Sequence, residues 1–421
     1  MMKMKWMPIL FILPAVVLLL VLCSSAAAVQ EVNPGPDETI TMALAGDTII
    51  TRRVKQFDDP RDPRFQKMVT IIREADVAFL NLELSLFRPS EFKGQPQAEH
   101  GGNWELGPPE AAEDLKFMGF DLMCRANNHT TDYGVEGMRL TDKLLDELGI
   151  VHSGSGMNLG QASRPGYLDT IKGRVALISF ASTFTKMSRA GASRDDMVGR
   201  GGLNPLRIKK GQPLERDKER ILHEIRNATM LSDFVIVTSH THGGNKNVEP
   251  PVWQPGFAKE CIDAGAITYV SHGPHQLRGI EIYKGKPIFY SLGNFIFQNE
   301  TIDPMPADNY ERLDLPPDKL AGELYDKRFK GGTIGFPSES IWYESVIAVP
   351  TFSQGKLVDL KLYPVELNHK APRSQRGTPR LVYGEVAEKV VKRLAELSEP
   401  LGCHIEYKDG IGTWVRKKDS K

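Results

Sequence analysis

Residues 119–134, GFDLMCRANNHTTDYG, join a short apolar run to a strongly polar turn. The part from 120 to 129 predicts a strand that is buried on both faces and that ends in Asn127, Asn128 and His129. Asn128 is compatible with a left-handed turn, but a turn alone has no need of an imidazole beside two carboxamides. This strand end is therefore a candidate functional position.

Five other apolar runs have the same form, and each ends in polar residues. They are TITMALAGD at 39–47, ADVAFLNLE at 75–83, RVALISFAS at 174–182, DFVIVTSHTH at 233–242 and AITYVSHGPH at 266–275. Helix-like stretches separate several of them, with proline near the start or glycine past the end of some. The expected helices are 63–75, 109–118, 135–148, 214–231 and 254–264. Strands that alternate with helices predict an α/β fold.

The later part of the chain predicts antiparallel strands instead. Residues 279–297 read as a hairpin that turns at 284–286, and 345–367 as another that turns at 354–355, before a charged helix at 383–397. Two segments, 185–213 and 300–340, are longer than usual connections, which indicates lids, insertions or local disorder and makes them candidates for substrate selection. We expect one domain over 39–367, with an extension at 368–421 that packs on it.

The composition excludes some partners and some kinds of site. Basic and acidic residues number 53 each, so no net charge favours a nucleic acid partner. Of the four cysteines, Cys23 lies in the N-terminal segment expected to be a signal; without it, Cys124, Cys261 and Cys403 are widely spaced and odd in number, which argues against a disulfide framework or a thiolate zinc site. Cys124 and Cys261 lie in apolar surroundings and are expected to be buried, inert thiols.

The N-terminus resembles a secretory signal. Lys3 and Lys5 precede an apolar run at 9–22, and small residues follow up to Ala28, the expected cleavage site. A retained membrane anchor is the alternative, although the run is shorter than the roughly 20 residues that span a bilayer. We therefore expect an exported protein, periplasmic or extracellular, in which residues 1–28 are either removed or kept as an anchor.

Polar side chains gather at the expected strand ends. Because carboxyl ends of strands in an α/β sheet share one side of the molecule, residues distant in sequence can converge there. Carboxylates, a carboxamide and several imidazoles form a set of metal ligands, not a Ser-His-Asp set. The candidates are Asp47, Glu83, Asn128, His129, His240, His242, His272 and His275.

Each candidate also has a structural explanation when it is taken alone. Asp47 can cap a turn, Glu83 can pair with a surface arginine, and a single buried histidine is usually a hydrogen-bonded structural group. The His-Thr-His spacing at 240–242 places both rings on one face only if the strand continues. The ligand types suit Zn, Mn or Fe and disfavour Ca, which prefers oxygen ligands alone.

Several motifs in order resemble the CapA/PgsA family of poly-γ-glutamate capsule synthesis proteins, whose domain resembles a calcineurin-like metallophosphoesterase. They are AGD at 45–47, FLNLE at 79–83, GFDLMCRANNHTTDYG at 119–134, SHTHGG at 239–244, and SHGPH with IEIYKGKPIFYSLGNFIF at 271–297. The resemblance covers roughly 39–367. It implies a metallophosphatase-like layered sandwich, with two mixed β-sheets flanked by helices.

The resemblance also implies roles for individual residues. Metal ligands would be Asp47, a bridging Glu83, Asn128, His240, His272 and His275, for one or two ions. His129 would be the proton donor, and Asp132 would orient its ring. His242 is an additional candidate ligand. Asn294 in SLGNF would either support the site or serve a turn.

Three departures from the motifs of typical phosphoesterases indicate that one of the two metal ions is weakly held or absent. Ile49 stands where the Asp-x-His motif has its histidine, Glu83 replaces the bridging aspartate, and 271–275 replace Gly-His-x-His. Four arginines, Arg125, Arg189, Arg194 and Arg200, are candidates for holding an anionic substrate, but solvation at the surface is the favoured interpretation.

These observations leave three functions open. The first is an exported CapA-like protein that acts in the synthesis, export or anchoring of an anionic polymer, poly-γ-glutamate or capsule, through a metal-dependent hydrolase site. The second is a non-catalytic accessory subunit of a membrane capsule-synthesis complex. The third is a secreted metal-dependent phosphodiesterase with no role in capsule synthesis. Buried polar side chains favour a metal site over a pure scaffold, because they are costly without partners.

Overall fold

The computed structural model describes residues 39–97, 102–244 and 248–416, and all of them belong to one compact unit that spans Asp37–Lys421. The expected signal segment, residues 1–28, lies outside the described residues. Within the described part of the chain, no helix is both long and apolar enough to cross a membrane.

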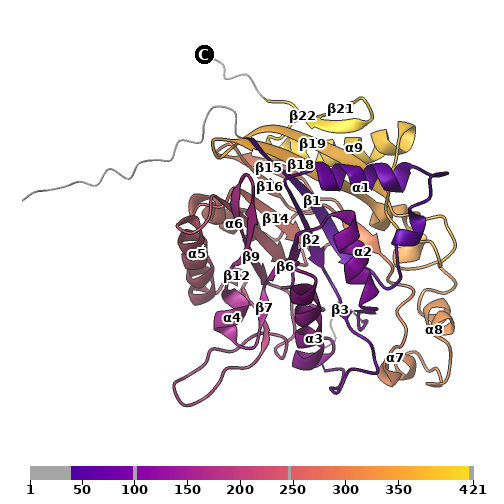
Figure 1. The fold of residues 1–421 in the computed structure, drawn as a ribbon. Coiled ribbons are helices and arrows are strands. Elements are labelled where there is room, and N and C mark those ends of the chain that lie inside the picture. The colour runs from indigo at the N-terminus through magenta and orange to yellow at the C-terminus, as the bar shows by residue number, and fades with distance from the viewer. Residues whose placement is uncertain (1–38, 98–101, 245–247, 417–421) are drawn as a thin grey trace, which may run out of the picture. The chain divides into compact units, whose positions relative to one another are not determined.

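The larger sheet contains ten strands and is mixed (Figure 1). Parallel pairing joins β1, β2, β5 and β6, and antiparallel pairing adds β18, β19, β22 and β21, while β17 pairs with β1 and β20 with β19. The bounds are β1 Thr39–Ile49, β2 Val77–Leu82, β5 Leu122–Cys124, β6 Val151–Ser153, β17 Asn294–Phe297, β18 Glu344–Ser353, β19 Lys356–Glu366, β20 Arg380–Leu381, β21 Ile405–Lys408 and β22 Ile411–Trp414.

The second sheet contains six strands in the order β15-β16-β14-β13-β9-β8. Its four central strands are parallel and both edge strands are antiparallel to their neighbours. The bounds are β8 Gly166–Thr170, β9 Gly173–Ala181, β13 Phe234–His240, β14 Thr268–His272, β15 Ile280–Tyr283 and β16 Lys286–Phe289.

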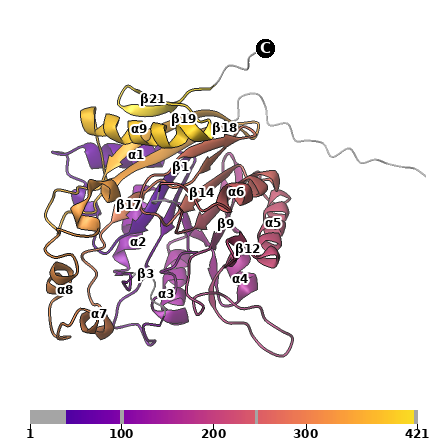
Figure 2. The ribbon, with the colours of Figure 1, turned by 180° about the vertical axis from the view of Figure 1, so that it is seen from behind.

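Helices cover the outer faces of both sheets, so the order of the layers is α/β/β/α (Figures 1 and 2). Helices α1 and α2 pack on the larger sheet, α5 and α6 pack on the second, and apolar side chains from both sheets meet between them. The bounds are α1 Arg64–Glu74, α2 Glu110–Met118, α3 Gly134–Glu147, α4 Leu159–Ser163, α5 Glu215–Thr229, α6 Gln254–Asp263, α7 Ala307–Glu311, α8 Ala321–Arg328 and α9 Gly384–Ser398. The predicted sandwich of two mixed sheets is confirmed.

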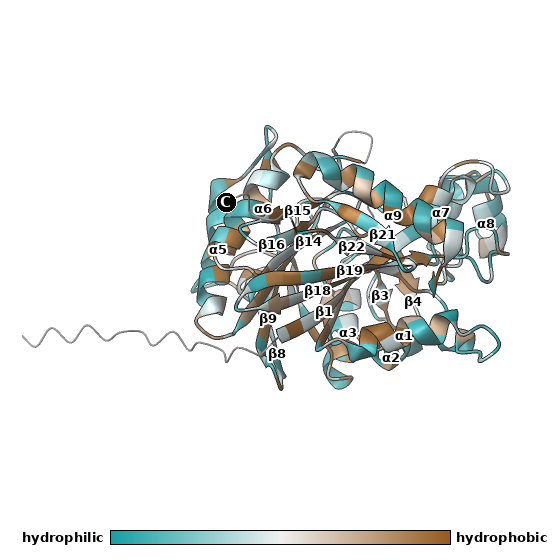
Figure 3. Ribbon diagram, turned by 90° about the horizontal axis from the view of Figure 1, so that it is seen from above, coloured by the Kyte–Doolittle hydropathy of each residue, from teal (hydrophilic) through white to brown (hydrophobic). Residues whose placement is uncertain are grey.

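The helices form where the sequence alternates apolar and polar residues with helical spacing. In α1 the buried residues Phe65, Met68, Val69 and Ile72 follow the i, i+3, i+4, i+7 pattern of a single apolar face. Burial of such side chains stabilises the fold by about 1.5–3 kcal/mol each. Figure 3 shows the result, with largely hydrophobic strands inside and helices of mixed hydropathy outside.

The structure corrects two predicted elements. The strand expected at 120–129 ends at Cys124, because the Thr130 hydroxyl bonds the backbone of Arg125 and Asn127 and closes a turn. The hairpin expected at 279–297 consists of β15 and β16 only, and β17 pairs parallel with β1.

The two long segments hold short regular elements. The first contains β10 Gly202–Leu203, β11 Ile208–Lys209 and β12 Gln212–Pro213, where β10 pairs with β7 Ser155–Gly156. The second contains α7 and α8, whose apolar side chains join a cluster with Leu106 of β4 Leu106–Gly107, the partner of β3 Ser85–Leu86. Helix α9 packs against β21 and β19, in the part of the chain expected as a C-terminal extension.

Candidate metal centre

The candidate residues converge where strands of the two sheets end. Asp47 lies near the end of β1 and Glu83 directly follows β2 in the larger sheet, while His240 and His272 end β13 and β14 in the second. His240 and His272 are register partners across parallel strands, so their side chains leave the second sheet at the same level. The layered fold therefore brings distant motifs to one place.

Two buried carboxylates form the centre of the cluster, and a carboxamide joins them. Asn81 Nδ2 donates to Asp47 Oδ1 over 2.8 Å and lies 3.4 Å from Glu83 Oε2. The same nitrogen lies 3.2 Å from His240 Nδ1. Asp47 Oδ2 accepts a hydrogen bond of 3.0 Å from the backbone N–H of Gly273. Asn81 thus fixes the two carboxylates and one imidazole relative to one another.

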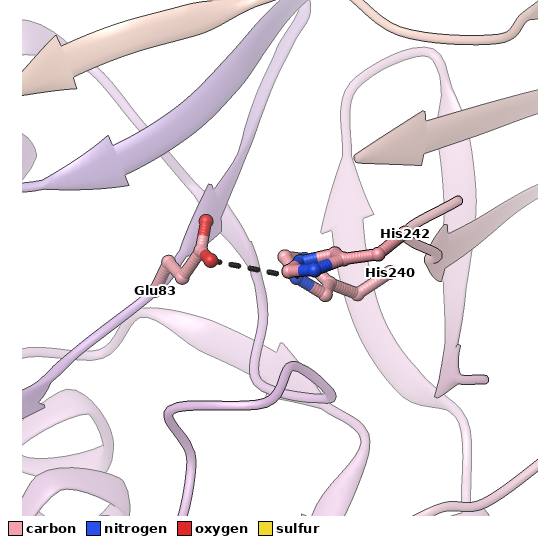
Figure 4. A group of neighbouring side chains, drawn as sticks. All are labelled: Glu83, His240 and His242. Atoms are coloured by element: carbon pink, nitrogen blue, oxygen red, sulfur yellow. Dashed lines mark hydrogen bonds and ion pairs between the residues drawn. The ribbon is translucent and has the colours of Figure 1, made fainter. Parts of the chain in front are cut away.

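His240 and His242 both face Glu83 (Figure 4). His240 Nε2 lies 3.4 Å from Glu83 Oε1 and 3.0 Å from His242 Nε2. The regular strand ends at His240, and the backbone of His242 is held by the Thr183 hydroxyl over 2.9 Å. Although the strand does not continue to His242, the rings of His240 and His242 therefore stay side by side.

Two groups of side chains have the geometry to hold a cation. Glu83, His240 and His242 form one, and Asp47, Glu83 and His275 form the other, each with ligand atoms within 4.8 Å of one another. Glu83 is shared, which suits the bridging position that the resemblance implies.

His275 is oriented by Asn294. Its Nδ1 lies 2.8 Å from Asn294 Oδ1, while Asn294 Nδ2 donates to the backbone carbonyls of His275 and Trp342. His275 Nε2 lies 3.7 Å from Glu83 Oε1. Asn294 is the register partner of Asp47 in the β1/β17 pair, so the SLGNF motif is built into the site.

His272 and Asn128 lie at the site but outside both three-residue groups. His272 is fully buried, with Nδ1 3.4 Å from Asp47 Oδ1, and neither ring nitrogen has a hydrogen-bond partner among the described residues. Asn128 lines the same cavity as His242 and His275.

His129 and Asp132 form a buried dyad. His129 Nδ1 lies 2.6 Å from Asp132 Oδ2, which also accepts a hydrogen bond of 2.8 Å from the backbone of Glu105. Asn127 links the turn after β5 to β2. Its Nδ2 donates to Asn81 Oδ1 and Leu82 O, and its Oδ1 accepts a hydrogen bond from the His129 backbone. The two asparagines of ANNH thus have different positions: Asn127 contacts Asn81 of β2, and Asn128 lines the cavity.

Burial and mutual contact set the protonation of the central groups. Burial would raise the pKa of Asp47, but contacts with His272, and next with His275 and His240, hold its pKa below the ordinary value. Burial, and next the Asp47 charge, raise the pKa of Glu83 well above its ordinary value. Burial lowers the pKa of His240 and of His275. Neutral imidazoles beside one ionised carboxylate are ready to accept a cation.

A cavity of about 240 Å³ opens onto the cluster. His129, His242 and His275 line it together with Ile49, the residue that stands in place of the usual phosphoesterase histidine. Phe336 and Trp342 form part of another wall. Phe336 belongs to the long segment at 300–340, which the sequence makes a candidate for substrate selection, and Trp342 follows that segment.

The sequence interpretation missed Asn81, Asn103 and Glu105. Asn81 is a polar residue inside a fully buried strand and lies two positions before Glu83 on the same face, which is a signal that could have identified it. Asn103 and Glu105 line the cavity, and Asn103 Nδ2 donates to Glu105 Oε1 over 3.0 Å. Neither Asn103 nor Glu105 comes directly after one of the six expected strands, so the pattern of polar residues at strand ends did not indicate them.

The favoured interpretation of Arg125 as a solvated surface residue is wrong. Its side chain is fully buried, donates to the carbonyls of Leu82 and Leu84, and pairs with Asp142 at 3.3 Å. It thereby ties the end of β2 and the residues that follow it to the turn after β5. The three buried cysteines are free thiols, as expected for Cys124 and Cys261.

The fold and the cluster together define a metallophosphatase-like α/β protein with a candidate metal centre. Residues 41–299 match the family described as bacterial capsule synthesis protein PGA_cap. The chain belongs to this family.

Similar proteins extend the comparison over most of the chain. An uncharacterized protein of Sinorhizobium fredii is 39% identical, over 88% of this chain and 92% of its own length. The capsule biosynthesis protein CapA of Bacillus anthracis is 30% identical, over 68% of this chain and 67% of its own. The PGA biosynthesis protein CapA of Bacillus subtilis is 30% identical, over 69% and 70%.

Proposed function

We propose that this protein is exported and takes part in the synthesis, export or anchoring of an anionic cell-surface polymer, poly-γ-glutamate or capsule, through a metal-dependent hydrolase site. The names of the two Bacillus relatives support the polymer pathway. The N-terminal sequence pattern supports export, and either a cleaved signal or an anchor would bring the protein to a membrane capsule-synthesis complex.

The observation that carries the metal site is a set of buried polar atoms that make no hydrogen bond, although titratable neighbours lie 3.4 Å from two of them. Among the described residues, Glu83 Oε1 and both ring nitrogens of His272 have no hydrogen-bond partner, although all three atoms are buried. Each such atom costs about 1–3 kcal/mol unless a ligand satisfies it. A divalent transition metal, Mn, Zn or Fe, would fit this mixed set of imidazole and carboxylate donors.

Asp47, Glu83, His240 and His275 would hold one or two ions, with His242, His272 and Asn128 as further ligands. A bound ion would supply Lewis acidity toward a phosphoester or amide and lower the pKa of a coordinated water. Asn81 and Asn294 orient the ligands by hydrogen bonds, so the site is organised before any ion binds.

His129 is placed to move a proton at the cavity wall. Because Asp132 engages its Nδ1, proton transfer to a leaving oxygen or nitrogen would use Nε2. Asp132 itself is fixed by the Glu105 backbone, which holds the ring plane of His129 in one orientation.

A non-catalytic accessory role is the second candidate, and Ile49 favours it. An apolar side chain occupies the cavity wall where typical phosphoesterases have a metal-binding histidine. One ion would then be held less tightly, and the site would bind polymer without cleaving it.

Turnover and polymer production distinguish the two roles. The mature protein with Mn or Zn should hydrolyse aryl phosphodiesters or poly-γ-glutamate, and His129→Ala should abolish turnover while the metal content stays the same. Cells that lack the gene should regain polymer with the wild-type copy and not with His129→Ala. Full restoration of polymer by the His129→Ala copy would refute the hydrolase and leave the accessory role.

A further inference from the structure

A second pocket, of about 420 Å³, is strongly basic. Its lining comes from the inserted segment at 185–213, from Leu159 at the start of α4 and from the first turns of α5. Figure 2 shows α4, β12 and α5 at the same side of the molecule. Five guanidinium groups and one carboxylate line it, in a chain whose basic and acidic residues are equal in number. These residues are Arg189, Arg200, Arg207, Arg216, Arg220 and Asp217.

The single carboxylate, that of Asp217, is paired with two of the arginines. Asp217 is buried, and its two oxygens each accept a hydrogen bond of 2.6 Å from Arg207, while Arg220 lies 3.0 Å from Oδ1. Arg200 donates to the backbone carbonyls of Lys186 and Arg189. The network fixes these guanidinium groups in place and leaves an excess of positive charge.

Arg189 and Arg216 complete the pocket in a different way. In the described ranges of the chain, neither guanidinium has a carboxylate within ion-pair distance. Arg216 is exposed on the first turn of α5, whose N-terminus adds partial positive charge to the same pocket. Two arginines at a pocket that already has excess positive charge favour an anionic ligand from solution.

The basic pocket is connected to the metal centre through the end of β9. Ala181 is the register partner of His240, and its carbonyl accepts a hydrogen bond of 2.7 Å from the backbone of Leu206. Pro205, the residue before Leu206, lines the basic pocket. Two residues after Ala181, the Thr183 hydroxyl holds the backbone of His242. Residues at the end of β9 therefore contact elements of both sites.

We infer that the basic pocket is a subsite that binds carboxylate groups of a polyanionic chain whose neighbouring units reach the metal centre. Guanidinium groups pair with carboxylates through two parallel hydrogen bonds, which suits a polymer with one carboxylate per unit. The identity of the polymer rests on the proposed function, whereas the subsite itself rests on the arrangement of the arginines. The pocket binds a long substrate through contacts that do not involve the metal ligands.

Binding of labelled poly-γ-glutamate to the mature protein at low salt tests this inference. Arg189→Gln/Arg216→Gln should weaken binding roughly five- to thirtyfold, because each lost pair is worth a few-fold in affinity. Arg194→Gln is the matched control, since Arg194 lies in the same segment, pairs with Asp196 and does not line the pocket. Arg216→Glu alone, at an exposed position, should weaken binding as well, and thermal unfolding should show that every variant folds.

The inference would be overturned by unchanged affinity in both pocket variants, by an equal loss in Arg194→Gln, or by a preference for polyphosphate with no binding of poly-γ-glutamate. Asp47→Ala/His240→Ala should keep arginine-dependent binding; loss of all binding in that variant would place the polymer at the metal centre alone. Absence of turnover with arginine-dependent binding intact would reject the hydrolase and support the subsite.

Discussion

Replacement of Glu83 by glutamine should stabilise the metal-free protein while it removes the response to metal. The ligand atoms of Asp47, Glu83 and His275 lie within 4.8 Å of one another. Two unit charges at that distance repel by about 3.5 kcal/mol at an effective dielectric constant of about 20. Neighbouring imidazoles and protonation of Glu83 offset part of this cost, so we expect a gain of about 1–3 kcal/mol in the free energy of unfolding.

The pH dependence of this gain has a definite sign. Since the pKa of Glu83 is raised in the folded protein, the fold binds this proton more tightly than the unfolded chain does. The stability of the wild type therefore falls as the pH rises above the ordinary glutamate pKa of 4.5. Glu83→Gln has no carboxyl proton to lose, so its free energy of unfolding should exceed that of the wild type at pH 8 and equal it at pH 4.5.

The assay is thermal and chemical unfolding in a chelator at both pH values, repeated with added Mn or Zn. Glu344→Gln is the matched control: Glu344 is also buried, but Lys389 and Arg393 pair with it, so that substitution should destabilise the protein. A metal-dependent rise in stability should occur in the wild type and in Glu344→Gln only. A destabilised metal-free Glu83→Gln, or one that still responds fully to metal, would refute the reasoning.

Three further substitutions probe the surroundings of the site. Asp132→Asn should lower turnover by roughly 10²-fold at unchanged metal content, because the His129 ring loses its fixed orientation; equal turnover would remove the dyad from the mechanism. Glu105→Gln should raise the free energy of unfolding by roughly 3 kcal/mol at pH 8 and not at pH 4.5, because burial raises the pKa of Glu105 to about 7 and the wild type loses stability between these values; a pH-independent effect in unfolding experiments would contradict this. Gly273→Ala should weaken metal binding about tenfold or more in titrations, because φ is +106° there and the new Cβ would lie 2.6 Å from His242 Cδ2; an unchanged affinity would show that the ring can move without cost.

The sequence was sufficient to predict the layers because each central strand is a nearly continuous apolar run. Burial on both faces requires such runs, and the polar residues that follow them could only lie at the sheet edge. Asp47, Glu83, His240 and His272 were identified in this way, and in the structure His240 lies 3.4 Å from Glu83 and His272 lies 3.4 Å from Asp47.

Other features could not be predicted because they depend on contacts between distant segments. The basic pocket forms only when the inserted segment at 185–213 packs against the start of α5, so Arg216 and Arg220 had no visible relation to Arg189. Arg125 is buried where it contacts the carbonyls of Leu82 and Leu84, distant residues that no local pattern relates to it. The parallel pairing of β17 with β1 is likewise a property of the assembled sheet.

The metal content of the purified mature protein tests the central claim most directly. The wild type, loaded with Mn, Zn or Fe and then dialysed, should keep one or two equivalents of metal by mass spectrometry, and Glu344→Gln should match it. Asp47→Ala/His240→Ala should lose this metal, because one residue of each ligand group is removed. No bound metal in the wild type, or equal metal in the double variant, would contradict the account.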